Sequence, residues 1–362
     1  MNAAAKNYDG VNKYIRITDI DEASSTYTDK DIVSPDGVLT DNYLVNNRDI
    51  LLARTGASTG KSYLYKKSDG KLYYAGFLIR ANVTTHDPYF VFSQLHTHRY
   101  WRWVSIMSAR SGQPGINSQE YSSFPIYTTS IEEESKIAKL LSLLDERIAT
   151  QNKIIEDLKK LKSAIIDYAI NSLDTDFAKF GSLYEMAGEG GTPTTSNASF
   201  YDNGKIPFIK IDDLKQKYLT ENKDFITELG LQKSSAWLVP THSILFSNGA
   251  TIGEISITTY PVCTKQGILG IVPKQNIDVE FLYYFMSSSY FKKAVSRIVT
   301  EGTMKTAYLK DINNILCPIP TKEKQQEIAK MPSALNSKID FEQSILKLFC
   351  SQKQHLLRQM FI

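Results

Sequence analysis

The chain has 362 residues, of which 42% are hydrophobic and 22% are charged, so it is long enough for two folded domains and has the composition of a soluble protein. No apolar run approaches the roughly 20 residues that a membrane helix needs, and the N-terminal segment lacks the apolar core of a signal peptide. The formal net charge of +3 excludes a global basic field, so a nucleic-acid surface would have to be local. Three cysteines, an odd number without metal-ligand spacing, indicate reduced thiols in a cytoplasmic protein.

Residues 1–130 are predicted to form a globular α/β (α+β) domain. Short β-rich runs such as Asp49–Ala53 are separated by Gly, Asn and Pro, and they alternate with amphipathic stretches such as Pro88–Val104. The segment Gly56–Ser62 looks like a phosphate-binding loop, but that loop needs four residues between its glycines and a helix after them, whereas a strand is expected here. A structural turn is therefore favoured over a nucleotide site.

The other candidate motifs do not assemble a catalytic or metal site. Asp87–Phe90 resembles the Asp-Pro-Pro-Tyr loop of amino-methyltransferases, but it has one proline where two are needed, and no glycine-rich cofactor-binding segment precedes it. A helix start with proline in the first turn is the simpler interpretation. The five histidines are scattered, without acidic or thiol partners at ligand spacing. We therefore expect no metal, no cofactor and no catalytic residue.

Residues 131–170 are predicted to be one long helix, the first helical spacer, because they contain neither Gly nor Pro. Ser130 is placed to cap this helix, with Glu133 completing a capping box. Residues at alternating steps of four and three form a heptad seam, that is, one mainly apolar stripe along the helix. The seam comprises Leu144, Ile148, Gln151, Ile155, Leu158, Lys162, Ile165 and Ala169.

The remainder of the chain repeats this organisation. Gly56–Gly60 recurs as Gly249–Gly253, 193 positions later. Glu132–Lys139 recurs as Glu323–Lys330, at an offset of 191 that then holds without gaps to the end of the sequence. Such matches, in the same order along the chain, indicate a tandem duplication.

The second repeat has its domain in residues 171–320 and its helical spacer in residues 321–362, and it differs from the first at two places. Its opening segment Phe180–Ser199 has no counterpart in the first repeat, so the first domain is expected to lack an edge element. Pro332 is expected to interrupt and kink the second helix after its Thr321 cap. The equivalent seam comprises Leu335, Ile339, Glu342, Leu346, Phe349, Lys353, Leu356 and Met360.

The two seams favour an antiparallel coiled coil. In the register in which facing residue numbers add up to 504, apolar residues meet apolar ones, Lys162 meets Glu342 and Gln151 meets Lys353. A parallel pairing would place Lys162 against Lys353, a like-charge contact in a dry interface. A heptad pattern alone is equally typical of an ordinary two-helix core or a dimer, but here it joins two copies of one domain. Two such domains related by a pseudo-two-fold axis match the symmetry of half-sites in duplex DNA.

Over essentially its whole length the chain resembles the specificity (S) subunits of type I restriction–modification systems. The likeness rests on the duplication, on Ile50–Gly60 with Ile244–Gly253, and on Pro318–Pro320 leading into Glu323–Ala329. The resemblance implies two target-recognition domains, each reading half of a split, asymmetric site in double-stranded DNA. It also implies two methyltransferase (modification) subunits docked on the helices, restriction (translocase) subunits joined through them, and no catalytic activity in the chain itself.

Candidate DNA contacts are the polar and basic residues beside the repeated glycines, because glycine lets a loop approach phosphates while its neighbours reach base edges. A second loop, before each long helix, adds further candidates. Those of the first domain are Arg54, Thr55, Ser58, Lys61, Arg110, Gln113 and Asn117. Those of the second domain are Ser247, Asn248, Thr251, Lys265, Gln266, Lys305 and Thr306. For any single residue, ordinary solvent exposure is an equal alternative.

Two other classes of function stay open at this stage. A DNA methyltransferase with its own recognition domain would need a Rossmann-like cofactor-binding unit, and neither repeat has the pattern of one. A scaffold that binds other proteins would lack the steep salt dependence of binding to DNA phosphates.

Overall fold

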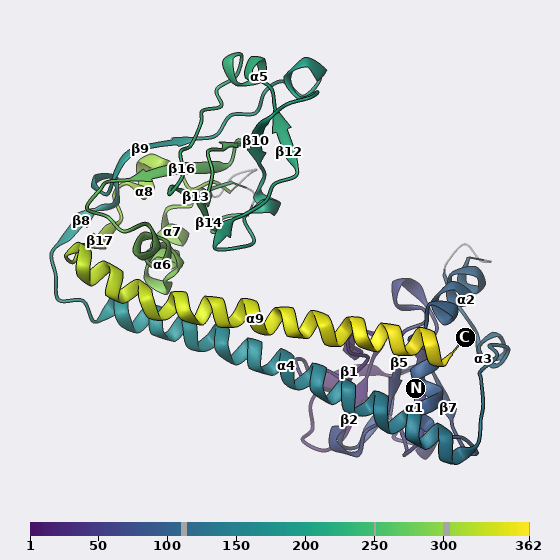
Figure 1. The fold of residues 1–362 in the computed structure, drawn as a ribbon. Coiled ribbons are helices and arrows are strands. Elements are labelled where there is room, and N and C mark those ends of the chain that lie inside the picture. Colours follow the sequence, from purple (N-terminus) through teal and green to yellow (C-terminus); the bar gives the residue numbers. More distant parts are fainter. Residues whose placement is uncertain (110–113, 250, 300–304, 362) are drawn as a thin grey trace. The chain divides into compact units, whose positions relative to one another are not determined.

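The structure, a computed structural model, describes residues 1–109, 114–249, 251–299 and 305–361. It divides into two compact units, Met1–Ile154 with Glu342–Ile362, and Ile155–Phe341. Each unit contains one globular domain and one segment of each of two long helices (Figure 1). Within the described residues none of the helices combines the length and the hydrophobicity that a membrane span requires.

The domain of the first unit is built around a small antiparallel sheet that helices cover on one face. Its elements are the strands β1 Ala4–Asn7, β2 Lys13–Ile15, β3 Val33–Asp36, β4 Asp49–Ala53, β5 Ser62–Leu64, β6 Leu72–Tyr74 and β7 Leu78–Asn82, and the helices α1 Pro88–Gln94, α2 His98–Ser108 and α3 Ser118–Ser122. The sheet has the order β5-β4-β7, and alternate residues of β4 point to opposite faces. Ile50 and Leu52 therefore pack against α1 and α2, whereas Leu51 and Ala53 pack with β2 and β6.

The domain of the second unit has a larger sheet, which is antiparallel except for one parallel pair at its edge, β11 with β14. Its elements are the strands β8 Phe177–Lys179, β9 Tyr184–Glu189, β10 Ile206–Ile209, β11 Tyr218–Leu219, β12 Asp224–Ile226, β13 Ile244–Ser247, β14 Ile255–Thr258, β15 Cys263–Thr264, β16 Ile268–Pro273 and β17 Leu316–Pro318, and the helices α5 Glu228–Gln232, α6 Val279–Ser287, α7 Ser289–Ile298 and α8 Leu309–Ile312. The main sheet has the order β11-β14-β13-β16-β9, beside a sheet β12-β10-β15 and a pair β17-β8. Ile244 and Phe246 of β13 pack with α6 and α7, and Leu245 belongs to a separate core on the other face.

The two domains share one core plan. Strands β5, β4 and β7 correspond to β14, β13 and β16, and helices α1 and α2 correspond to α6 and α7. The helix caps correspond as well, because Asp87 and Asp278 cap α1 and α6, and Thr97 and Ser288 cap α2 and α7. The members of each pair are 191 residues apart. The mixed fold class and the tandem duplication are therefore confirmed.

The sheets of the two domains differ at one edge. Strand β16 pairs with β13 on one side and with β9 on the other, whereas β7 pairs with β4 alone among the described residues. Strand β9 lies within the segment Phe180–Ser199, for which the first repeat has no counterpart. The first domain therefore has the shorter sheet.

The two long helices are α4, Ile131–Asn171, and α9, Lys322–Met360. Pro332 lies inside α9 and is buried, so the expected interruption of the second helix at this residue is wrong. Proline removes one hydrogen bond of the helix. The apolar residues on either side of it, such as Ala329 and Ile339, are buried, and their packing offsets that loss.

Helices α4 and α9 pack together as an antiparallel coiled coil, as expected. In each unit the segment of one helix lies against the segment of the other, and every residue of the two predicted seams is buried or partly buried. The polar seam residues Gln151 and Glu342 are each only 7% exposed.

The register of this pairing differs from the predicted one by about a heptad. In the first unit Lys353 Nζ lies 2.6 Å from Asp145 Oδ1, and Gln151 Nε2 donates to the backbone oxygen of Glu342 at 3.1 Å and to its carboxylate. In the second unit Lys162 Nζ donates to Asn336 Oδ1 at 2.8 Å.

The predicted pairs, Lys162 with Glu342 and Gln151 with Lys353, are therefore wrong. Asp145 and Asn336 lie beside the seam, and the long lysine side chains reach sideways to them. A residue beside the seam can therefore supply the polar partner that a seam lysine needs. For this reason the register does not depend on pairing the lysines with polar residues of the opposite seam.

Candidate nucleic-acid interface

Three loops meet at the end of the central strand of the second domain, and they carry most of its predicted DNA contacts. Asn248, directly after β13, donates its backbone N–H to the Gly267 oxygen at 3.0 Å, and its own backbone oxygen accepts from the Ala307 N–H at 2.9 Å. A Cβ on Gly249 would lie 3.3 Å from the Gly267 Cα, so the first two loops touch. We refer to this meeting of the loops at residues 248–249, 251–253, 265–267 and 305–307 as the loop junction.

The first domain has an equivalent loop junction. Arg54, directly after β4, donates its backbone N–H to the Phe77 oxygen at 3.0 Å. The Arg54 backbone oxygen accepts from the Ile116 N–H at 2.9 Å. The same two backbone hydrogen bonds therefore join the same three loops in both repeats.

The candidate side chains at the two junctions differ in accessibility. The exposed candidates are Arg54, Asn117, Thr251, Lys265, Gln266 and Lys305. The partly buried candidates are Thr55, Ser58, Lys61 and Thr306. The buried candidates are Ser247 and Asn248, and Arg110 and Gln113 lie outside the described residues.

The two buried candidates hold the junction of the second domain together. Asn248 is 1% exposed, and its Nδ2 donates to the Ala307 backbone oxygen at 3.2 Å. Ser247 Oγ accepts from the Glu254 backbone N–H at 2.8 Å. A side chain buried in this way cannot reach a base edge, so we assign Ser247 and Asn248 a structural role.

Two further candidates in the first domain have partners within the protein. Lys61 Nζ lies 3.2 Å from Glu22 Oε2. Asn117 Oδ1 caps α3 by accepting from the Glu120 N–H at 2.9 Å. Both side chains are accessible to a ligand, but Lys61 would have to give up its ion pair and Asn117 its capping hydrogen bond in order to bind one.

The two motifs that resemble enzyme loops are structural in this fold. Gly56–Ser58 is a single 3-10 turn, and strand β5 follows it where a phosphate-binding loop would open a helix. Gly60 has a φ of 92°, a conformation that favours glycine. Asp87 caps α1 with Pro88 in the first turn.

An equivalent contact fastens each domain to a long helix. In the first unit the buried Glu134 of α4 accepts from the Asp87 backbone N–H at 2.9 Å. In the second unit the buried Gln325 of α9 accepts from the Asp278 backbone N–H at 2.8 Å. Sequence reasoning missed these two acceptors, although the offset of 191 residues aligns them. They fix the N-terminal ends of α1 and α6, and with them each domain, on the helix.

A buried lysine strengthens that attachment in the second unit. Lys217 Nζ lies 2.9 Å from Glu280 Oε2 of α6, and it donates to Ser333 Oγ of α9 at 2.9 Å. Its ammonium also lies 4.9 Å from the centre of the Tyr284 ring. Burial lowers the pKa of Lys217, and the hydrogen bond and charge of Glu280 oppose that effect. This network therefore joins the sheet edge, α6 and α9.

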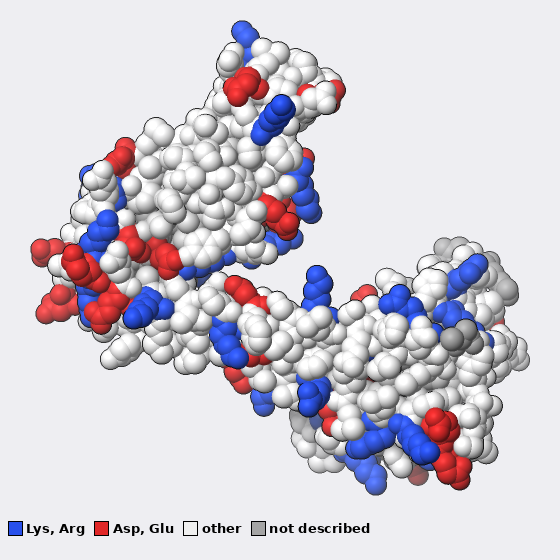
Figure 2. Space-filling model, viewed as in Figure 1, with Lys and Arg blue, Asp and Glu red and all other residues white. Residues whose placement is uncertain are grey.

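Exposed residues on α2 and α7, beside the glycine turns, were missed by sequence reasoning. Trp101 and Ile106 of α2 are 41% and 57% exposed. Lys292 and Arg297 occupy the equivalent positions of α7 and are exposed too. Aligning the two helices at the offset of 191 could have found them. On the face seen in Figure 2, Lys and Arg alternate with Asp and Glu, in keeping with the small net charge.

Comparison with known protein families gives a match over most of the chain. The family described as "Type I restriction modification DNA specificity domain" matches residues 1–160 and 174–348. The type I restriction enzyme MjaIX specificity subunit of Methanocaldococcus jannaschii is 32% identical over 173 residues, which are 46% of this chain and 39% of that protein. The MjaVIII specificity subunit of the same organism is 24% identical over 83% of this chain and 75% of its own length. The match thus spans well under two thirds of the first of these relatives.

Solved structures show the same fold. The crystal structure of a type I restriction-modification system S subunit from M. genitalium superposes with a TM-score of 0.61 at 17% identity. The match covers 98% of this chain and 89% of that one.

Proposed function

Because this chain belongs to the family of type I restriction–modification DNA specificity domains, we propose that it reads a split, asymmetric site in double-stranded DNA, with one half-site for each domain. Two methyltransferase (modification) subunits dock on the helices, and restriction (translocase) subunits join through them. The chain itself supplies recognition and no catalytic group.

The observation that carries this proposal is the loop junction, which occurs twice with the same backbone hydrogen bonds and different exposed side chains. The first junction presents Arg54, whereas the second presents Thr251, Lys265 and Gln266. Two copies of one scaffold with different polar side chains are what the reading of two unlike half-sites requires.

The exposed side chains have the chemistry for DNA. An arginine pairs with the O6 and N7 atoms of guanine, and a glutamine pairs with N6 and N7 of adenine. Arg54 and Gln266 are therefore the proposed base readers at the two junctions. Lys265 and Lys305 are proposed to contact phosphates, which position the domain without selecting a sequence.

An apolar groove on the helices supports the docking of a modification subunit. In the first unit α4 and α9 form a groove of about 250 Å³ whose lining includes Leu140, Leu143 and Phe349. Leu140 and Leu143 are 46% and 44% exposed. Exposed apolar residues that gather in one place mark a surface that a partner covers.

The test is to co-express the chain with the modification subunit of its own system and to sequence the methylated bases of the host genome. We expect methylation at one bipartite sequence with a spacer of fixed length. Methylation without such a site would contradict the proposal. Methyl transfer from S-adenosylmethionine by the purified chain alone would instead favour the methyltransferase alternative.

A further inference from the structure

Helices α2 and α7 present matching exposed faces. On α2 the face consists of Trp101, Arg102, Ser105 and Ile106, and on α7 it consists of Lys292, Lys293, Ser296 and Arg297. All eight residues are exposed, and each member of the first set is 191 positions before its equivalent in the second. The scaffold below the faces is the same, because both helices have a side-chain cap and bury an equivalent valine, Val104 or Val295.

In the first domain this face adjoins the glycine turn of the loop junction. A Cβ on Gly60 would lie 2.7 Å from Val104 Cγ1 and 3.0 Å from Trp101 Cζ3. The indole of Trp101 therefore covers the turn and makes the surface of α2 continuous with the junction loops.

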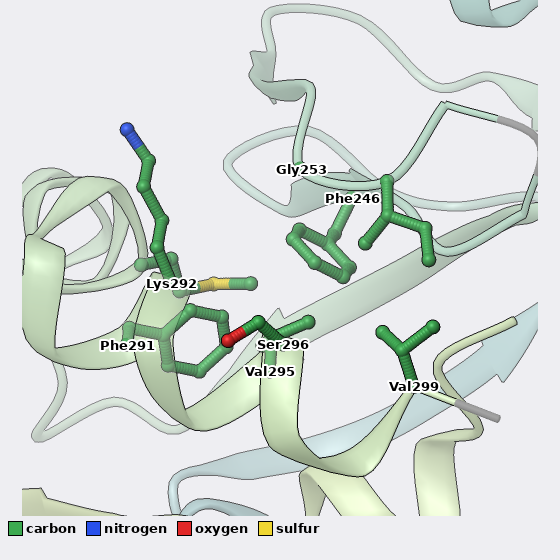
Figure 3. A pocket seen from close by; sticks show the side chains of 9 residues that line it. Phe246, Gly253, Phe291, Lys292, Val295, Ser296 and Val299 are labelled. Carbon is green, nitrogen blue, oxygen red and sulfur yellow. The ribbon is translucent and has the colours of Figure 1, made fainter. Parts of the chain in front are cut away.

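In the second domain the equivalent space is open. Gly253 has no atom within 4 Å of an added Cβ, and a pocket of about 200 Å³ lies between this turn and α7. Phe246, Val295 and Ser296 line the pocket, and the Lys292 side chain extends away from it (Figure 3). The replacement of Trp101 by Lys292 thus gives the two faces different shapes on one scaffold.

The charge and polarity of the faces fit a nucleic acid. Within the part of the chain that the structure describes, Arg102, Lys292, Lys293 and Arg297 make no ion pair with a carboxylate. Cations gathered in this way are stabilised by phosphates.

The two faces differ in the bases that they suit. Trp101 and Ile106 offer apolar contact to the methyl group of thymine, whereas Arg297 offers a bidentate pair to guanine. Each helix has 10 or 11 residues, which is about 15 Å of length, and an α-helix fits the major groove of B-DNA.

We propose that α2 and α7 enter the major groove of their half-sites, and that the four exposed positions on each helix contribute to the sequence read there. The proposal rests on the proposed function, which it extends from the junction loops to two helices. In the first domain the loops and the helix face then form one continuous DNA surface, whereas in the second a pocket lies between them.

The test exchanges one pair of equivalent residues in the assembled complex with the modification subunit. Ile106→Arg is expected to change one or two positions of the first half-site alone, and Arg297→Ile one or two positions of the second alone. The methylated sequence of each variant is read from the host genome. Unchanged half-sites in both variants, with wild-type methylation at the bipartite site, would overturn the helix assignment and leave the proposed function standing.

A second measurement separates a DNA contact from a structural role. Lys293→Ala is expected to weaken binding of the complex to its duplex about 10-fold at low salt, as the loss of a phosphate contact would. The matched control is Lys233→Ala, an exposed lysine at the end of α5, which should bind like the wild type. Equal affinity of the two variants would contradict the proposal. Absence of any bipartite methylated site in the wild type would instead overturn the proposed function, and the helix assignment with it.

Discussion

Gln151 and Glu342 are equivalent residues of the two repeats, and they contact each other, with Gln151 Nε2 donating to the Glu342 backbone oxygen at 3.1 Å. In an antiparallel pair of equivalent helices, a residue meets its own equivalent only at the centre of the pairing. The contacts of Lys353 with Asp145 and of Lys162 with Asn336 are likewise two copies of one contact, 191 residues apart. These three contacts define the register.

The register predicts which charge exchange restores stability. Lys353→Glu places a like charge against Asp145 and is expected to cost about 1–3 kcal/mol. Combining it with Asp145→Lys should return at least about 1 kcal/mol as favourable coupling in a double-mutant cycle. Urea denaturation of the four proteins measures that coupling.

The control for this cycle combines Lys162→Glu with Glu342→Lys. These two residues would face each other in the register predicted from the sequence, in which facing residue numbers add up to 504. We expect these two changes to destabilise the protein without favourable coupling. Recovery in this pair, and none in the pair of Lys353 and Asp145, would show that the helices pair in the other register.

The loop junction predicts different roles for two neighbouring polar residues. Asn248→Ala should lower the free energy of unfolding by about 1–3 kcal/mol, because it removes a buried hydrogen bond. Gln266→Ala should leave stability nearly unchanged and relax one or two positions of its half-site by about 1–3 kcal/mol. Thermal unfolding and binding to a series of single-base variants of the site measure the two effects.

Lys265→Ala is the comparison within the same loop. It should weaken binding to all DNA sequences about equally. It should also reduce by about one the slope of the logarithm of the binding constant against the logarithm of the salt concentration. Relaxed specificity in Asn248→Ala at wild-type stability would contradict the structural role of that residue.

A partly buried histidine, His96, makes the stability of the first domain depend on pH. Burial lowers the pKa of His96 from 6.5 to about 4, and the nearby charge of Lys353 adds to that effect. Folded His96 therefore stays neutral where the unfolded chain binds a proton, so stability falls as the pH drops from about 6.5 to about 4, by roughly 3 kcal/mol in total. His96→Gln should remove this part of the loss when urea midpoints are compared at pH 7.5 and 4.5. His355→Gln, at an exposed position of α9, should keep the wild-type pH dependence.

The helical spacers are proposed to set the spacer of the DNA site. Deleting Ile155–Leu161 together with Leu346–Gln352 removes the same heptad from both repeats and keeps both seams in phase. The shortening of about 10 Å corresponds to about three base pairs. Methylome sequencing should show a shorter spacer with both half-sites unchanged, and an unchanged spacer in an active complex would refute this role of the helices.

The sequence was sufficient to predict the fold class, the duplication and the antiparallel pairing, because each of them follows from a pattern that extends over many residues. The seams are an example, since every position follows from the spacing of Leu144, Ile155 and their neighbours. The register could not be predicted, because a shift by one heptad again places apolar residues opposite apolar ones. The choice then depended on Lys162 and Lys353, whose partners lie beside the seam.

The candidate site was predicted at the level of loops and less well at the level of side chains. Arg54 and Asn248 both directly follow a central strand and lie one or two residues before a glycine, so the sequence pattern alone does not distinguish their roles. Only the fold shows that Asn248 is buried against Ala307 while Arg54 is exposed. The exposed face of α2 with Trp101 was missed because the helix also has apolar residues on its buried face. The sequence alone does not show which of the apolar residues are exposed.

The central claim is that each domain reads its own half-site, and a domain exchange tests it most directly. Residues 1–130 are replaced by the matching domain of a related subunit, and the complex with the modification subunit is expressed in a host whose methylome is then sequenced. Because each domain has its own core and its own loop junction, we expect one half-site to change and the other to stay as in the wild type. A change of both half-sites together would contradict the account, because recognition would then be a joint property of the two repeats.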